Sequence, residues 1–337
     1  MDIKLITPDD LKKLTSTRAG ETKIGETLQL GSELLLEELQ DSKVQFVIFG
    51  IPEDIGPRAN LGRGGSDSAW EAFVQRFINL QDNQHLAGES CMLLGSIENK
   101  QWKNIASTDH AALREAVEKL DVIVSELVQM IVAANKIPIL IGGGHNNAYG
   151  AIKGCFQATG KAINCINLDP HADYRALEGR HSGNSFSYAK KEGFLNQYAL
   201  VGLHKNYNSK NMLQQLNADG IYYNFFEDIF IENKISYALA IQQMHDKVKQ
   251  DTYGVELDCD AIENFPTSAQ TPSGISANQA RQYICQVAAS KKAIYLHLPE
   301  AAPSLIPGSE GQVGKLLAYL VADFIRIRGA AYHSSTN

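Results

Sequence analysis

The chain has 337 residues, and 44% of them are hydrophobic, which is enough for a large core. Its 31 basic and 38 acidic side chains give a net charge of −7, so the composition lacks the basic character of nucleic-acid-binding proteins. The five cysteines include no CxxC pair, which argues against a zinc ribbon or thioredoxin-like chemistry.

The N-terminal sequence lacks the pattern of a signal peptide, and no apolar run approaches the ~20 residues needed to span a bilayer. We therefore expect a cytoplasmic protein without membrane or nucleic-acid partners. No internal repeat or linker-like composition is present. We predict an N-terminal extension over residues 1–40, which wraps the core or serves an oligomer contact, and a single domain over residues 41–337.

From residue 44 onward, short apolar runs alternate with longer amphipathic stretches. In chain order the pattern predicts a strand at 44–51, a helix at 66–80 with Ser66 near its N-cap, a strand at 91–97, a helix at 109–135, a strand at 137–143, a helix at 147–157 and a strand at 162–169. It continues with a strand at 198–204, a helix near 208–217, a strand at 221–224, a helix at 233–249, a strand at 252–258, a helix at 276–289, a strand at 293–298 and a helix near 309–328. Strands that are apolar throughout and separated by helices indicate a mostly parallel sheet covered on both faces. The predicted fold is a three-layer α/β/α sandwich.

Potential metal ligands or acids stand at the ends of four of these strands. In open α/β sheets, ligands bind where the strands end at their carboxyl edge. The residues concerned are His145 after the strand at 137–143; Asp169, His171 and Asp173 at the end of the strand at 162–169; Asp258 and Asp260 at the end of the strand at 252–258; and Glu300 after the strand at 293–298.

The spacing of these residues favours a metal site. Alternate residues of an extended chain project to one side, so the DxHxD segment from Asp169 and the DxD segment from Asp258 each present their groups together. Four carboxylates and two imidazoles suit Mn²⁺ better than a cysteine-based zinc site, and two divalent ions would relieve the carboxylate repulsion and activate water. Each motif alone could be a hydrogen-bonded cap or a tight turn, but their joint occurrence after buried strands favours a two-metal site.

The motifs GGGH (142–145), NLDPHADYR (167–175) and ELDCDAI (256–262) resemble, in order and spacing, the three metal motifs of the ureohydrolase superfamily, which includes arginase, agmatinase and formimidoylglutamase. The resemblance covers roughly residues 44 to 328. It implies an arginase-like α/β/α fold with two Mn²⁺ ions per chain. By the motifs, one ion would be held by His145, Asp169, Asp173 and Asp258, and the other by His171, Asp169, Asp258 and Asp260.

One segment departs from the arginase pattern. Where arginases read SGNxH, with a histidine that shuttles protons, this chain reads SGNSF, so Phe186 stands at that position; formimidoylglutamases look like SGTPF there. His181, just before this segment, could take over part of the missing histidine's work. Residues 50–70 are similar to the N-terminal region of formimidoylglutamase-like members, and Arg58 or Arg63 in them either faces the site or lies solvated on a surface turn.

The resemblance also implies roles for further residues. The segment HLPEAAP (297–303) is similar to the late ExxP motif of the superfamily, by which Glu300 would pair with the cationic amidine of a substrate. Asp173, besides being a ligand, would relay a proton to the leaving amine. Arg175 is expected either to bind substrate carboxylates or to form a structural ion pair. The residues expected to contact the substrate are Arg175, Ser182, Asn184 and Phe186, the last as an apolar wall of the pocket.

We therefore predict a metal-dependent hydrolase that cleaves a C–N bond of a small amidine or guanidine. N-formimidoyl-L-glutamate, an intermediate of histidine degradation that would give L-glutamate and formamide, is the expected substrate. The alternatives are a guanidino-acid hydrolase, an agmatinase, an arginase, or a catalytically weak homologue with a regulatory or assembly role, against which the intact ligand set argues. The resemblance also implies a homo-oligomer.

Overall fold

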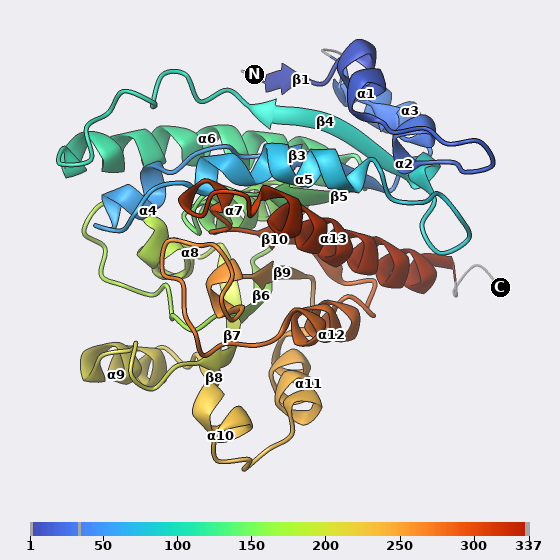
Figure 1. The fold of residues 1–337 in the computed structure, drawn as a ribbon. Helices are drawn as coiled ribbons and strands as arrows, with labels where there is room; N and C mark the ends of the chain where they lie inside the picture. Colours follow the sequence, from blue (N-terminus) through green and yellow to red (C-terminus); the bar gives the residue numbers. More distant parts are fainter. Residues whose placement is uncertain (1–2, 33–34, 334–337) are drawn as a thin grey trace.

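The centre of the molecule is a ten-stranded sheet in a computed structural model that describes residues 3–32 and 35–333 (Figure 1). The strands are β1 (Ile3–Leu5), β2 (Gln29–Leu30), β3 (Phe46–Gly50), β4 (Cys91–Ile97), β5 (Ile137–Ile141), β6 (Ile163–Leu168), β7 (Leu195–Leu203), β8 (Tyr222–Phe225), β9 (Tyr253–Leu257) and β10 (Ala293–Leu298). Their order across the sheet is β1-β4-β3-β5-β10-β9-β6-β7-β8, and β2 also pairs with β4. Every pair is parallel except β1 with β4.

Helices cover both faces of this sheet (Figure 1). They are α1 (Pro8–Leu14), α2 (Ile24–Thr27), α3 (Leu35–Asp41), α4 (Ile55–Ala59), α5 (Ala69–Phe77), α6 (His110–Ala133), α7 (Asn147–Thr159), α8 (Ser185–Lys191), α9 (Lys210–Ala218), α10 (Phe226–Phe230), α11 (Tyr237–Val248), α12 (Ala277–Val287) and α13 (Glu310–His333). One apolar core includes side chains of α5, α11, α12 and α13, and a second includes side chains of α6, α7 and α8.

Strand β3 shows why the sequence gives two cores. All five of its residues are buried, and Phe46 and Ile48 belong to one core while Val47 and Phe49 belong to the other. Successive side chains of a strand point to opposite faces, so a strand that is apolar throughout requires cover on both sides. The three-layer α/β/α sandwich with a mostly parallel sheet is therefore confirmed.

Two short strands among residues 3–32 pair with β4 near one edge of the sheet. Strand β1 pairs antiparallel with residues 95–97 of β4, and β2 pairs parallel with residues 92–93. These two short strands do not have the long apolar runs by which the sequence predicted the central strands. The helices of the described residues are too short or too polar for any of them to cross a membrane.

Several elements differ from their predicted bounds, and some short helices were not predicted. The predicted helix at 66–80 begins as a short 3₁₀ turn (Ser66–Ser68), and the hydroxyl of Ser66 donates to the backbone oxygen of Glu53 instead of capping the helix. The predicted helix at 233–249 begins later, at Tyr237, because the hydroxyl of Ser236 caps its first turn. Helix α10 was not predicted, since its five residues are too few for a periodic pattern.

Candidate metal centre

The sheet order brings the four predicted ligand-bearing strands together. They lie far apart in the sequence, yet β5, β10, β9 and β6 are four consecutive neighbours in the sheet. All four run parallel, so their carboxyl ends meet at one edge. His145, Glu300, Asp258 and Asp169 therefore converge.

A glycine turn supports His145 at the end of β5. Gly142 and Gly143 have positive φ angles of 79° and 70°, and a Cβ at Gly143 would come within 2.8 Å of an oxygen of Glu53. The buried carboxylate of Glu53 accepts hydrogen bonds from the backbone of Gly144 (2.7 Å) and from the side-chain amides of Asn146 and Asn147 (3.2 and 2.7 Å). The turn is thus fixed on both sides of His145.

His145 is the centre of the cluster. Its Nδ1 lies 2.9 Å from Asp258 Oδ2, 3.0 Å from Asp173 Oδ2 and 3.2 Å from Asp169 Oδ2. Among the described residues, these four side chains can each place one ligand atom within 4.8 Å of the other three. Asp173 reaches this position with a positive φ of 45°, which is a rare conformation outside glycine and turns the chain back toward the cluster.

A second, more open group of ligand atoms adjoins the first. His171 Nδ1 lies 3.7 Å from Asp169 Oδ1 and 3.8 Å from Asp260 Oδ2, and its side chain is 31% exposed. The His171 ring stacks on the ring of Tyr207, which fixes its plane. Asp169 belongs to both groups through its two oxygens, so all six predicted ligands are brought together.

The electrostatics of the cluster require cations. Burial, followed by repulsion from Asp173, raises the pKa of Asp169 to about 7. Burial and the neighbouring aspartates raise the pKa of Asp258 and of Asp260, and Oδ1 of Asp260 is buried without a hydrogen-bond partner. Carboxylates gathered in this way without a cation repel each other, whereas divalent ions would neutralise them and use the free oxygen. The donor set fits a site for two metal ions.

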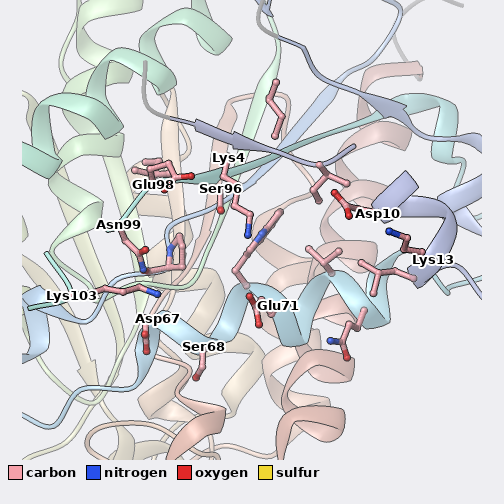
Figure 2. Close-up of a pocket in the computed structure, with 18 residues that line it drawn as sticks. Lys4, Asp10, Lys13, Asp67, Ser68, Glu71, Ser96, Glu98, Asn99 and Lys103 are labelled. Carbon is pink, nitrogen blue, oxygen red and sulfur yellow. The ribbon is translucent and has the colours of Figure 1, made fainter. Parts of the chain in front are cut away.

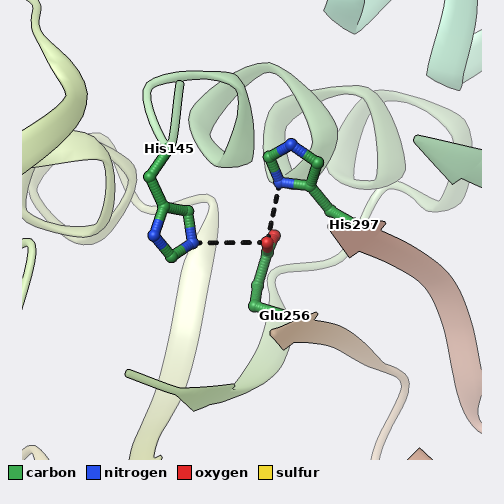
Figure 3. A group of neighbouring side chains, drawn as sticks. All are labelled: His145, Glu256 and His297. Atoms are coloured by element: carbon green, nitrogen blue, oxygen red, sulfur yellow. Dashed lines mark hydrogen bonds and ion pairs between the residues drawn. The ribbon is translucent and has the colours of Figure 1, made fainter. Parts of the chain in front are cut away.

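Behind His145 lies a buried acid that the sequence reading missed. The carboxylate of Glu256, in β9, lies 3.4 Å from His145 Nε2 and 2.7 Å from His297 Nδ1 (Figure 3). Tyr295 donates its hydroxyl to the other oxygen of Glu256 at 2.7 Å. Burial alone would raise the pKa of Glu256, but the charge of His297 and the close contacts with both histidines lower it to about 2. The signal in the sequence was a charged residue inside the apolar run TYGVEL.

A small cavity of about 260 Å³ opens onto the cluster. Its walls include His171, Asp173, Asp258, Asp260 and Glu300, and at its outer part Arg175, Ser182 and Asn60. Glu300 is buried, accepts a hydrogen bond from the backbone of His145 (2.8 Å), and accepts one from the Ser268 hydroxyl (3.3 Å). Arg175 is half exposed and donates to Asn60 Oδ1 (3.0 Å), and it also forms an ion pair with Glu178 (3.6 Å), the alternative that the sequence left open for it. Asn60 donates to the Ser182 hydroxyl (3.3 Å).

Two predicted substrate contacts lie outside this cavity. Phe186 is fully buried, with its ring stacked on Tyr198 (centroids 4.2 Å apart) and edge-on to His145 (5.3 Å). Asn184 is also fully buried and accepts hydrogen bonds from Arg180 and from the backbone of His181. Both side chains support the site from behind.

The remaining residues singled out from the sequence have structural partners. Arg58 pairs with Asp54 and bonds Ser107, whereas Arg63 donates to the backbone oxygen of Ser268 beside Glu300. His181 accepts from the backbone of Gly183 and contacts Glu178, and burial lowers its pKa to about 4. Cys259, which stands between Asp258 and Asp260 in the sequence, is buried, and burial raises the pKa of its thiol. Neither His181 nor Cys259 lines the cavity.

A separate cavity of about 560 Å³ lies between the N-terminal segment and α5 (Figure 2). Charged side chains of both signs line it, among them Lys4, Asp10, Glu71 and Lys103. None of the predicted site residues lines this cavity, and the metal-ligand clusters of the described residues lie elsewhere. The smaller cavity at the carboxyl edge of the sheet, which borders the metal-ligand cluster, is therefore the candidate functional site.

The fold and the cluster together define an α/β protein with a binuclear type of metal site at the carboxyl edge of its sheet. A sequence profile of the arginase family matches residues 44–325, and the chain belongs to that family.

Relatives within the family agree with this placement. The chain is 25% identical over 304 residues to the formimidoylglutamase of Fusobacterium nucleatum, covering 87% of this chain and 89% of that protein. It is similar in structure to the formimidoylglutamase of Bacillus subtilis (TM-score 0.75, 16% identity, 94% of each chain covered). It is also similar to Trypanosoma cruzi formiminoglutamase solved with Mn²⁺ (TM-score 0.71, 19% identity, 92% of this chain and 99% of that one).

Proposed function

We propose that this protein is a manganese-dependent hydrolase that converts N-formimidoyl-L-glutamate to L-glutamate and formamide, a step of histidine degradation. The observation that carries the proposal is the polarity of the cavity. Its lining includes the buried carboxylates of Glu300, Asp258 and Asp260, and it also includes Arg175, whose side chain is half exposed. A substrate with a cationic amidine at one end and carboxylates at the other matches this arrangement.

The ligand assignment follows from the two groups of atoms. His145, Asp169, Asp173 and Asp258 would hold one ion, and His171, Asp169, Asp258 and Asp260 would hold the other. A set of carboxylate oxygens and imidazoles without thiolate suits Mn²⁺, and the T. cruzi relative was solved with that ion. When bound, two divalent ions supply the Lewis acidity that lets water attack the amidine carbon.

The protein groups then bind the substrate and move its protons. Glu300, held by the backbone of His145 and the hydroxyl of Ser268, would pair with the amidinium nitrogens. Asp173 borders the cavity with a side chain that is 12% exposed, so one of its oxygens can accept the proton of the attacking water. The same oxygen would then pass that proton to the leaving amine.

The rim of the cavity supplies the specificity. Three hydrogen-bonded polar side chains line the cavity: Arg175 donates to Asn60, and Asn60 donates to the Ser182 hydroxyl. Carboxylates of glutamate would find a charge-assisted partner in Arg175. Agmatine has a second cationic end and no carboxylate, so the same guanidinium would repel it. Curated relatives that are formimidoylglutamases, at 23–25% identity over most of the chain, support the same choice.

The test is turnover of a substrate panel with enzyme loaded to the same Mn²⁺ content. We expect kcat/KM for N-formimidoyl-L-glutamate to exceed the values for arginine, agmatine and guanidino acids by at least about tenfold, which needs about 1.4 kcal/mol. A better rate with any of those three would reassign the substrate while leaving the hydrolase intact. If the fully loaded enzyme turned over no substrate of the panel, N-formimidoyl-L-glutamate included, a regulatory or assembly role would be favoured.

A further inference from the structure

Glu256 is a carboxylic acid that is buried in the core, without contact to solvent. It is fully buried in the middle of the sheet, between His145 on one side and His297 on the other (Figure 3). Its Oε1 accepts the hydroxyl of Tyr295 (2.7 Å), and its Oε2 lies 2.7 Å from His297 Nδ1 and 3.4 Å from His145 Nε2. Three possible donors therefore face one carboxylate: His145 follows β5, and Tyr295 and His297 both stand on β10.

The two nitrogens of His145 face different surroundings. Nδ1 points at oxygens of Asp169, Asp173 and Asp258, so it is the atom that would bind an ion. A ligand nitrogen must be free of its proton, which leaves the imidazole proton on Nε2. Nε2 is buried and has no hydrogen-bond partner in the described part of the chain, and the carboxylate that faces it is Glu256, with Oε2 at 3.4 Å.

We propose that Glu256 is a positioning residue of the metal centre: its carboxylate takes the Nε2 proton of His145 as a hydrogen bond and so holds the imidazole with Nδ1 turned to the ions. His297 and Tyr295 hold Glu256 in place for this purpose. A carboxylate behind a histidine ligand fixes the tautomer and the ring orientation, which strengthens metal binding. The proposal rests on the two-ion site of the proposed function and is independent of the choice of substrate.

A competing reading is that His145, Glu256 and His297 themselves hold an ion, since their ligand atoms also lie within 4.8 Å of one another. His145 would then have to bind metal through both nitrogens. The hydroxyl of Tyr295 already occupies Oε1 of Glu256, and His297 Nδ1 lies 2.7 Å from Oε2. The hydrogen-bonded arrangement is therefore the simpler one, and metal stoichiometry separates the two.

The first experiment compares Glu256→Gln with Tyr295→Phe. A glutamine has one acceptor oxygen and cannot accept from all three donors, so its amide would turn toward a histidine and favour the tautomer with the proton on Nδ1. Tyr295→Phe removes a partner of the same carboxylate but leaves the contact with His145. The chelated proteins are titrated with Mn²⁺ alone, without substrate, and free Mn²⁺ is followed by electron paramagnetic resonance. We expect Glu256→Gln to bind at least about tenfold more weakly, and Tyr295→Phe to stay within about threefold of the parent.

A second pair of variants keeps the test valid if Glu256→Gln does not fold. His297→Asn retains an N–H close to the position of Nδ1, whereas His297→Leu removes the donor. We expect His297→Asn to restore most of the Mn²⁺ affinity that His297→Leu loses, while the thermal unfolding midpoints of the metal-free variants are recorded alongside. A purely structural role would lower both midpoints without this difference in affinity.

The outcomes are distinct. Parent-like Mn²⁺ affinity in folded Glu256→Gln, or equal affinities in the two His297 variants, overturns the positioning role and leaves the metal centre standing. A third ion per chain that His297→Leu loses overturns it in favour of a metal site at the three residues. A parent protein that binds no Mn²⁺ overturns both this role and the proposed centre, whereas failure to turn over formimidoylglutamate affects the substrate assignment alone.

Discussion

The carboxylate of Glu53 accepts a hydrogen bond of 2.7 Å from the backbone N–H of Gly144, the residue immediately before His145. Glu53 follows β3, and β3 and β5 are parallel neighbours, so the segments after the two strands lie side by side. The same acid accepts from the backbone of Gly56 at 3.1 Å. Residues 50–56 therefore support the turn that presents His145, which gives this part of the sequence a role in the site without contact to the substrate.

Replacing Glu53 by Gln is expected to destabilise the fold and loosen the metal centre. The amide cannot accept from both Gly56 and the Gly144 turn, so at least one buried N–H loses its partner, at about 1–3 kcal/mol. The free energy of unfolding of the metal-free protein, measured by urea denaturation, should fall by that amount. The matched control is Glu71→Gln at an exposed position of α5, which should leave it unchanged. Equal stabilities of the two variants would contradict the role given to Glu53.

The metal content can be tested at Asp258. Its Oδ2 lies 2.9 Å from His145 Nδ1 and its Oδ1 accepts the backbone N–H of Asp260, so it stands where both proposed ion positions meet. The parent protein, reloaded with Mn²⁺ after chelation, should hold close to two ions per chain by mass spectrometry of the metal, and Asp258→Asn should hold fewer. Chelation should abolish activity and Mn²⁺ should restore it. Full activity of a rigorously metal-free sample would refute the metal-dependent mechanism.

The fold was predictable because each central strand is marked in the sequence by its own apolar run. The runs at 91–97 and 293–298 are mostly apolar, and β4 and β10 have those bounds. Strands β1 and β2 were missed because they are short and exist only through pairing with β4, a contact between distant parts of the chain. A local pattern cannot report a partner that lies roughly sixty to ninety residues away in the chain.

The convergence of the candidate metal ligands was predictable for a similar reason, whereas the contacts behind them were not. Each ligand follows an apolar run, and strand ends can be read from the sequence. The position of Phe186 depends on how α8 packs against β7, which no local pattern reveals, so its burial against Tyr198 differs from the pocket wall that was expected. Glu256 was overlooked because a single acid within a strand pattern does not show which face it occupies or what lies opposite.

Glu300→Gln should preserve the metals and reduce catalysis. Gln retains an oxygen for the backbone N–H of His145 but loses the charge that would face a cationic amidine. We expect kcat/KM to fall on the order of a hundredfold, as for other electrostatic contacts to the transition state. Mn²⁺ content per chain serves as the control and should stay at the parent value. A parent-like kcat/KM would show that Glu300 does not contact the substrate.

Arg175→Ala should raise KM for N-formimidoyl-L-glutamate without removing metal. Because the side chain is half exposed, its contribution is screened by solvent and should be about 1 kcal/mol, or roughly fivefold in KM. For agmatine, the repulsion from the Arg175 guanidinium should disappear, so its kcat/KM should rise relative to that of N-formimidoyl-L-glutamate. Arg18→Ala removes the same charge from an exposed position in the N-terminal segment and should change neither value. Similar shifts in both variants would indicate a long-range charge effect in place of a contact.

Phe186→His places an imidazole where arginases have their shuttling histidine, and the packing predicts that it will fail to act as one. The ring of Phe186 is fully buried, stacked on Tyr198 and edge-on to His145, so a histidine there would face apolar rings instead of the cavity. Burying an imidazole without a partner should cost about 2–4 kcal/mol of unfolding free energy. Phe186→Leu, which keeps the site apolar but loses the ring, should cost less.

We expect no gain in arginine turnover from either variant, measured at equal Mn²⁺ content on the folded fraction. If Phe186→His instead raised kcat/KM for arginine about tenfold or more at parent-like stability, the side chain at this position would have to reach the cavity, and the absence of an imidazole there would itself set the substrate preference.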